Sequence, residues 1–233
     1  MTKYYYQKQR SYKTVVRFFS ALLLVFGLII SFYTFLPIFS WHLYFSESFA
    51  SQKINSPIPK ISTLVNTAGK TLSVNYLNAN NWFPNYHPKA DADEPGVGIY
   101  KMSIPSIDIK DAVVSTEDLN LAQHLVNFTG TAVPPNNGNA VIFGHSTLPQ
   151  LYNPKDYKTI FANAYKIKTG DEILVTFDKV IYKYKVVSII VVDPSDTSVL
   201  EQDTRDSFLT LITCTPPGTV WKRLVIKSRL VAI

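Results

Sequence analysis

The sequence predicts an all-β domain, a closed barrel or a sandwich, preceded by one N-terminal membrane-spanning helix. Three observations support this prediction. A long uncharged apolar run lies near the N-terminus. From about residue 96, short runs rich in β-branched and aromatic residues alternate with turn residues. Helical periodicity in that second part is confined to short stretches.

Composition and charge exclude one common class of partner. The chain has 233 residues and a formal net charge of +6. Residues 1–17 carry five basic side chains and no acid, which leaves 18 basic and 17 acidic side chains, a net charge of +1, for the rest. Because the body is nearly neutral, we expect no nucleic-acid surface on it.

Residues 18–41 form the apolar run. They are 24 consecutive residues without a charge, and about 20 suffice to cross the hydrocarbon as a helix. The basic segment 1–17 before them predicts a cytoplasmic N-terminal tail and an extracytoplasmic body. A cleaved signal peptide is the alternative, with a small-x-small site at residues 48–50, but its apolar region is normally only about 7–15 residues long. We therefore favour an uncleaved anchor.

Residues 42–95 separate the span from the β domain. They are rich in Pro, Asn and Ser and show no sustained period. We interpret them as an extracytoplasmic stalk or linker, within which residues 61–68 are compatible with a short helix. The folded domain then comprises residues 96–233.

Seven strands are predicted in that domain. Asp178-Lys179 is a tight-turn candidate that makes a hairpin of the two strands around it. Short helices are expected at residues 120–125 and 159–165. The predicted strands are residues 98–105, 107–114, 140–144, 172–177, 181–192, 208–214 and 222–233.

Cys214 is the candidate nucleophile. It is the single cysteine, so the chain has no internal disulfide. Taken alone, such a residue is more often buried and structural than reactive. However, Cys214 ends an apolar β-run directly before Thr-Pro-Pro-Gly, where a sheet fixes a side chain and a turn exposes it. If the strands on either side of this turn are neighbours, Arg223 returns to Cys214 and can stabilise an oxyanion.

A thiol nucleophile also needs a partner that accepts and donates protons. Of the four histidines, His42 lies at the membrane edge and His87 in the linker. His145 ends an apolar run after Gly144, and His124 lies in a short amphipathic stretch. The residues alone leave His145 and His124 as equal candidates.

Four segments resemble the sortase family. TLITCTPPG at residues 210–218, followed by Arg223, is similar to its cysteine signature, and GNAVIFGH at 138–145 is similar to its strand that ends in Gly-His. Residues 127–139 and 160–177 resemble the stretches before and after that histidine. The resemblance covers residues 98–231.

The resemblance implies a closed eight-stranded β-barrel and a cysteine transpeptidase. It matches Cys214 to the nucleophile, His145 to the general acid and base, and Arg223 to the residue that holds substrate and stabilises the oxyanion. It implies cleavage of a Leu-Pro-x-Thr-Gly-like sorting signal on surface proteins through a thioester. The acyl chain passes to an amine of peptidoglycan or a pilin lysine. An N-terminal membrane anchor is common in the family.

The loop at residues 193–207 indicates the sortase class and whether a metal ion is bound. It has no room for a long inserted helix, which favours a class A, D or E enzyme over class B. Some relatives bind calcium here, but metal binding needs three or more converging oxygens. We favour a solvated acidic loop and expect no cofactor, with calcium as the alternative. The loop's acids are Asp193, Asp196, Glu201 and Asp203.

Two other functions remain open from the sequence. The first is a sortase-like hydrolase, in which water resolves the thioester. The second is a membrane-tethered, non-catalytic β module in which Cys214 is only buried.

Overall fold

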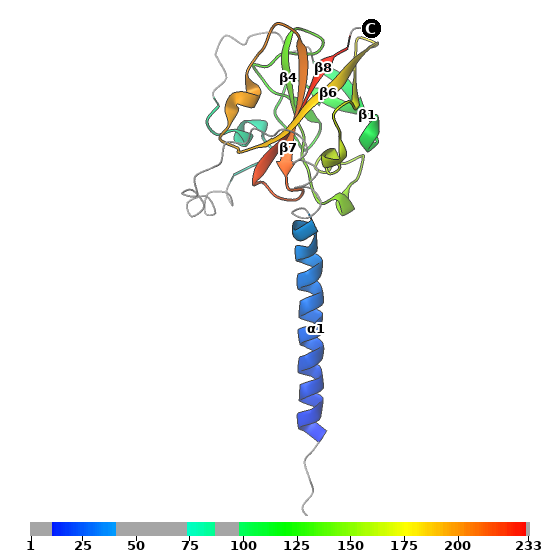
Figure 1. Ribbon diagram of the computed structural model, residues 1–233, viewed down its shortest axis with the longest axis vertical. Coiled ribbons are helices and arrows are strands. Elements are labelled where there is room, and N and C mark those ends of the chain that lie inside the picture. Colours follow the sequence, from blue (N-terminus) through cyan, green and yellow to red (C-terminus); the bar gives the residue numbers. More distant parts are fainter. Residues whose placement is uncertain (1–10, 41–73, 87–97, 232–233) are drawn as a thin grey trace, which may run out of the picture. The chain divides into compact units, whose positions relative to one another are not determined.

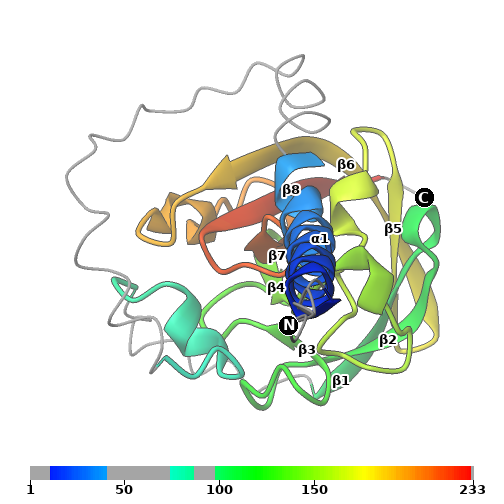
Figure 2. The same ribbon diagram turned by 90° about the horizontal axis from the view of Figure 1, so that it is seen from below.

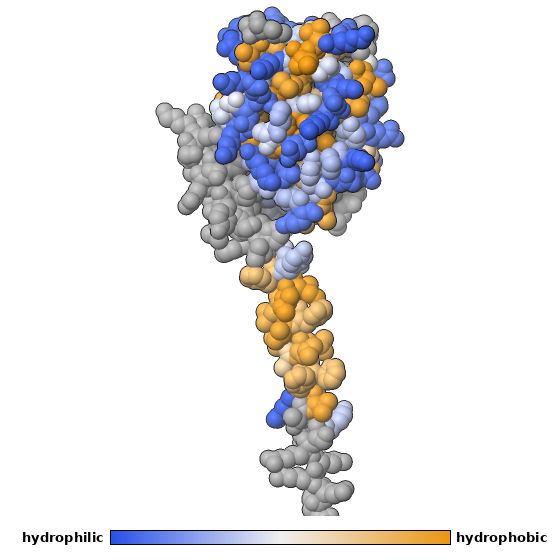
Figure 3. All heavy atoms as spheres, turned by 90° about the vertical axis from the view of Figure 1, so that its right-hand side faces the viewer, coloured by the Kyte–Doolittle hydropathy of each residue, from blue (hydrophilic) through white to orange (hydrophobic). Residues whose placement is uncertain are grey.

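The computed structural model describes residues 11–40, 74–86 and 98–231. The chain divides into two compact units, residues 1–54 and 55–233. The first contains helix α1, Ser11–Ser40. Its window Val15–Phe35 is 21 residues long and apolar enough to cross a membrane, and at about 1.5 Å per residue it spans about 31 Å. Figure 3 shows apolar residues along the length of this helix.

The second unit is a closed eight-stranded barrel (Figures 1 and 2). The strands follow the order β1-β2-β3-β4-β7-β8-β6-β5, and β5 pairs with β1 to close the sheet. Two neighbouring pairs, β2 with β3 and β4 with β7, are parallel. The strands are β1 Ile99–Ile104, β2 Ile109–Ser115, β3 Leu125–Asn127, β4 Gly138–Phe143, β5 Glu172–Phe177, β6 Val180–Val192, β7 Ser207–Thr215 and β8 Lys222–Leu230.

The barrel confirms the seven predicted strands and adds β3, which is only three residues long. The hairpin at Asp178-Lys179 is present, and both residues have positive φ, 48° and 67°. The predicted helix at 120–125 is wrong, because this stretch is a turn that leads into β3. The helix expected at 159–165 is instead a set of turns through residue 163 that leads into the short 3-10 helix η5, Ala164–Lys166. The linker helix expected at 61–68 lies outside the described residues.

β7 is almost completely buried along both faces. Side chains alternate along a strand, so one face of β7 points into the barrel and the other carries Thr210, Ile212 and Cys214. We call this second face, continued over β4, β8 and β6, the groove face. The part of this face around Cys214 is covered by the segment 74–86, which contains the 3-10 helix η2 (Ala79–Trp82).

The segment 74–86 packs as part of the barrel's hydrophobic core. Trp82 and Phe83 are 0% and 1% exposed, and they join one cluster with Phe143, Ile212 and Cys214. Backbone hydrogen bonds from Ala79 N to Leu119 O and from Leu121 N to Leu77 O attach the segment at its edge. A part of the chain that precedes the barrel therefore lies over its groove face.

Candidate active site

Cys214 lies one residue before the end of β7 and is 5% exposed. The turn that follows is closed by Thr219, whose N–H and hydroxyl both donate to Pro216 O. Gly218 has a φ of +80°, and a Cβ there would come within 3.1 Å of Leu148. The Pro-Pro-Gly sequence thus reverses the chain tightly and returns β8 to the side of Cys214.

Arg223 is directly opposite Cys214 in the antiparallel β7–β8 pair. Its Nη1 lies 3.7 Å from Cys214 Sγ and donates to Val220 O at 3.0 Å. Its Nη2 donates to Trp82 O at 3.1 Å. The side chain is 1% exposed, so a fixed guanidinium stands next to the thiol in a site shielded from water.

His145 reaches the same level from the other neighbour of β7. The parallel β4–β7 register pairs Phe143 with Ile212, and two further residues bring His145 level with Cys214. Side chains tie the two strand ends together. Thr213 Oγ1 donates to Gly144 O, and Ser146 Oγ donates to Cys214 O, both at 2.7 Å.

Gly144 is required by close packing immediately before His145. A Cβ on Gly144 would come within 2.5 Å of the Phe161 ring and 2.6 Å of Leu125. Phe161 N donates to His145 O at 2.9 Å. The Gly-His pair therefore lets β4 end against two buried side chains while the imidazole stays on the groove face.

Both reactive groups are held in their neutral forms. Burial raises the pKa of the Cys214 thiol, and the Arg223 charge opposes this only in part. Burial, together with the nearby Lys158 charge, lowers the pKa of His145 to about 4, against the opposite effect of Asp156. Near neutral pH the site thus contains a thiol and an uncharged imidazole.

Unpartnered polar atoms gather around Cys214. Four buried side-chain atoms in the described part of the protein have no hydrogen-bond partner, and two of them, His145 Nε2 and Arg223 Nε, belong to the residues on either side of Cys214. A third, Thr215 Oγ1, follows Cys214 on β7, where the alternation of side chains turns it to the opposite face. Because buried polar groups are normally paired, the first two atoms are suited to bind a peptide: Arg223 Nε–H can donate to a peptide carbonyl, and His145 Nε2 can donate or accept according to its tautomer.

The other histidine candidate is engaged elsewhere. His124 Nε2 lies 3.0 Å from Asp118 Oδ2, and its Nδ1 lies 3.0 Å from Leu125 O. Both ring nitrogens therefore have partners outside the site, so the geometry brings His145 and not His124 to Cys214. His42 and His87 lie outside the described residues.

Trp82 is a site residue that the sequence did not indicate. Its ring centroid lies 5.6 Å from that of His145 and 5.3 Å from Arg223 Cζ. Its Nε1 donates to Tyr76 O at 2.8 Å, and its own carbonyl accepts from Arg223. Trp82 is thus placed between the two groups that flank Cys214. The only signal in the sequence is an adjacent Trp-Phe pair within a polar, turn-rich stretch.

Three of the four candidate acids of the 193–207 loop, Asp193, Asp196 and Asp203, bind protein groups. Asp193 pairs with Lys222 at 2.6 Å, and Asp203 pairs with Arg205 at 2.7 Å. Asp196 caps the 3-10 helix η6 (Thr197–Leu200) by accepting from Ser198 N. Within residues 11–40, 74–86 and 98–231, no group of three or more His, Cys, Asp or Glu side chains is arranged to hold a metal ion.

Comparison with known proteins gives a consistent family. The sortase domain matches residues 102–231. Sortase A of Listeria monocytogenes is 29% identical over 142 residues, which are 60% of this chain and 60% of that protein. The structure resembles the lid mutant of sortase A from Corynebacterium diphtheriae (31% identity, 61% of this chain and 75% of that chain, TM-score 0.51). It also resembles sortase C-1 from Actinomyces oris (29% identity, 57% and 72%, TM-score 0.50). The chain therefore belongs to the sortase family.

Proposed function

We propose that this chain is a membrane-anchored transpeptidase that uses Cys214, His145 and Arg223. It would cleave a Leu-Pro-x-Thr-Gly-like sorting signal and transfer the acyl part to an amine of peptidoglycan or of a pilin lysine. The observation that carries the proposal is the level arrangement of these three residues on adjacent strands, with unpartnered polar atoms around the thiol.

The reaction follows from this arrangement. The Cys214 thiol gives its proton to the neutral His145 imidazole, and the sulfur attacks the scissile carbonyl. Arg223 donates to the oxygen that becomes negative. The His145 imidazolium then protonates the departing amine, which leaves a thioester on Cys214. In the second half, neutral His145 takes a proton from the incoming amine, which attacks the thioester and releases the thiol.

The segment 74–86 acts as a lid in this proposal. A peptide cannot reach Cys214 while Trp82 fills the space between His145 and Arg223. One relative of similar structure is described by its name as a lid mutant. Substrate binding therefore includes displacement of Trp82 from the groove face.

The cellular setting is part of the same proposal. Helix α1 has the length of a membrane span, and the five basic residues before and within its start predict a cytoplasmic N-terminus. The barrel would then act outside the membrane. Protease added to intact cells should remove the barrel but leave the N-terminal tail protected.

Trapping of the acyl-enzyme tests the function. The full-length chain in detergent, mixed with a library of sorting-signal peptides, should gain the mass of an acyl chain, and Cys214→Ala should not. Transfer that proceeds unchanged in Cys214→Ala would refute the proposal. Formation of product only in the presence of an amine supports transpeptidation, whereas equal release without an amine identifies a hydrolase. Failure of a thiol reagent to label Cys214 in the native chain would favour a non-catalytic module.

A further inference from the structure

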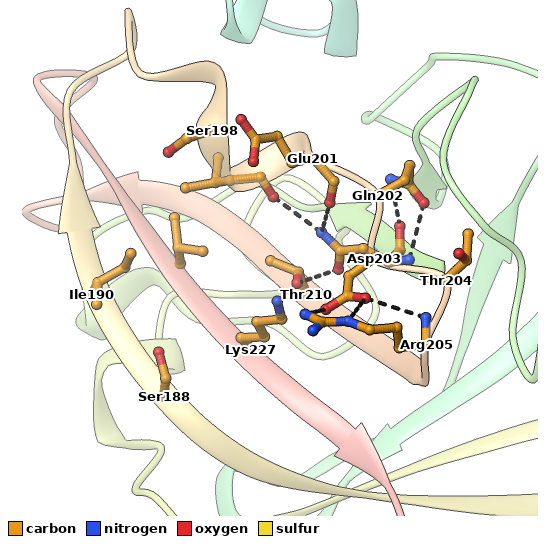
Figure 4. A pocket seen from close by; sticks show the side chains of 13 residues that line it. Ser188, Ile190, Ser198, Glu201, Gln202, Asp203, Thr204, Arg205, Thr210 and Lys227 are labelled. Carbon is orange, nitrogen blue, oxygen red and sulfur yellow. Dashed lines mark hydrogen bonds and ion pairs between the residues drawn. The ribbon is translucent and has the colours of Figure 1, made fainter. Parts of the chain in front are cut away.

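An open pocket lies on the groove face, away from the catalytic end. It has a volume of about 580 Å³ and is walled by the loop between β6 and β7 (Figure 4). No residue of the segment 74–86 lines it, so it stays open while Trp82 covers Cys214. Its floor contains Ile190, Val225 and Thr210, together with Lys227.

The pocket has an apolar end and a polar end. The apolar end is nearer the catalytic residues and contains Val225 and Ile190, which are paired with each other. Val225 lies two residues from Arg223 along β8. Lys227 lies two residues beyond Val225 on β8 and is paired with Thr210 on β7 and Ser188 on β6. An extended peptide bound along this face would therefore pass from an apolar to a polar surface.

Lys227 is a cation without a close ion-pair partner. Its Nζ lies 4.3 Å from the centroid of the Phe208 ring, and it makes no ion pair within the described residues. The wall acid Asp203 is itself held by Arg205 through two hydrogen bonds of 2.8 and 2.7 Å, which are the main cause of its lowered pKa, and the Lys227 charge contributes to that shift at longer range. In Figure 4 Glu201 lies beside Ser198, well away from Lys227. The polar end thus offers one unneutralised positive charge.

The wall of the pocket is preformed. Asn139 on β4 donates through Nδ2 to the carbonyls of Val199 and Glu201 at 3.1 and 3.2 Å. Gln202 in turn donates to Asn139 O and accepts from Asn139 N. These bonds hold the loop in place beside Lys227, so ligand binding there requires little additional ordering of the loop and has a small entropic cost.

Strand geometry gives the peptide position that reaches Lys227. Lys227 is four residues from Arg223, which at about 3.4 Å per residue is about 14 Å along the groove. An extended peptide advances about 3.4 Å per residue, so the matching position is four residues from the acylated one. The walled part of the groove suits the acyl portion, because that portion stays bound through both half-reactions while the leaving and incoming amines exchange at the open strand end.

We propose that Lys227 recognises an acidic side chain at the donor position just before the four-residue acyl part of the sorting motif. This inference rests on the proposed transpeptidase function. Lys227 is then a specificity-determining residue that binds a carboxylate.

The test is the peptide preference of the acyl-enzyme. The full-length chain in detergent is mixed with donors that carry Glu, Gln or Lys before a common motif chosen from the library, and acyl-enzyme formation is followed by mass spectrometry. We expect Glu to be favoured over Lys about fivefold at low salt, as for one partly exposed charge pair. The preference should fall when salt is raised to about 1 M, because screening then acts over about 3 Å.

Charge reversal separates recognition from a structural role. Lys227→Glu should reverse the order of preference, so that the Lys peptide is acylated faster than the Glu peptide, with the Gln peptide between them. Lys101→Glu, an exposed residue of β1, makes the same change in net charge and should retain the original preference. Equal use of the three peptides by the unaltered chain, or a Glu preference that survives Lys227→Glu, would overturn the inference. Absence of any acyl-enzyme would instead refute the proposed function.

Discussion

Replacement of Trp82 by alanine should open the catalytic site. Trp82 is fully buried, and its ring lies between His145 and Arg223. Loss of a buried Trp side chain typically costs about 3–5 kcal/mol, and here that cost falls on the closed position of the segment 74–86. About 1.4 kcal/mol corresponds to a factor of ten in an equilibrium constant. Even if only half of this cost falls on the closed state, the fraction of molecules in which the segment 74–86 is detached from Cys214 should rise at least tenfold.

The assay is the reaction of Cys214 with an aromatic disulfide that absorbs when cleaved. Cys214 is the single cysteine, so the signal has one source. Trp82→Ala should react at least ten times faster than the unaltered chain, and acylation by a donor peptide should accelerate as well. Asn78→Ala gives a graded comparison, because Asn78 caps η2 through Asn80 N and loss of a cap costs about 1 kcal/mol. It should accelerate labelling about fivefold.

The control is Trp221→Ala, which removes the same side chain from a position that is 58% exposed and outside the segment. Its labelling rate should stay within about twofold of the original. If Trp82→Ala also stays within twofold while its barrel unfolds at an unchanged temperature, the segment does not limit access to Cys214.

Three further predictions concern the catalytic end. Arg223→Lys should be acylated at least about a hundredfold more slowly, because a lysine cannot reproduce the guanidinium fork that reaches both Val220 O and Trp82 O. Its Cys214 should still be labelled by a thiol reagent. An unchanged rate of acylation would contradict this prediction. Gly144→Ala should destabilise the barrel by about 1–3 kcal/mol in urea unfolding, since its Cβ would overlap the Phe161 ring, and an unchanged midpoint would refute that packing argument. In the folded chain the pKa of His145 is about 4, below the ordinary value, so the unfolded chain binds more protons between pH 6.5 and pH 4. The free energy of unfolding should therefore fall from pH 6.5 to pH 4 by on the order of 2–3 kcal/mol more than it does in His145→Gln. Urea unfolding midpoints of both proteins at the two pH values measure this difference.

The strands were predictable because their signals are local. Runs such as residues 172–177 and 181–192 alternate strongly and flank a two-residue turn, and the structure has β5 and β6 there with shifts of one residue at most. β3 was not predictable, because three residues carry no period. β3 is a strand only because it pairs with β2 and β4, and these pairings depend on the tertiary fold.

The site was predictable to a different depth at each residue. Cys214 and Arg223 follow from one turn between two adjacent strands, so their pairing is a short-range consequence of the sequence. The choice of His145 over His124 needed either the family resemblance or the β4–β7 register, because parallel pairing across about 70 residues leaves no local trace. Trp82 is more than 60 residues from either catalytic strand end and contacts the site only through the tertiary fold.

The same burial that blocks access to Cys214 also sets its protonation, and this can be tested. Burial is the main cause of both the raised thiol pKa and the lowered imidazole pKa, so it disfavours the thiolate–imidazolium pair twice over. Removal of the Trp82 ring admits water to both groups. We therefore expect the midpoint of Cys214 labelling against pH to move down in Trp82→Ala, toward the ordinary thiol range.

A faster rate with an unchanged midpoint would mean that Trp82 restricts access alone and that the burial comes from the strand packing beneath it. A lower midpoint would mean that displacement of Trp82 by a peptide also prepares the thiol for attack. Substrate recognition and activation of Cys214 would then be one event.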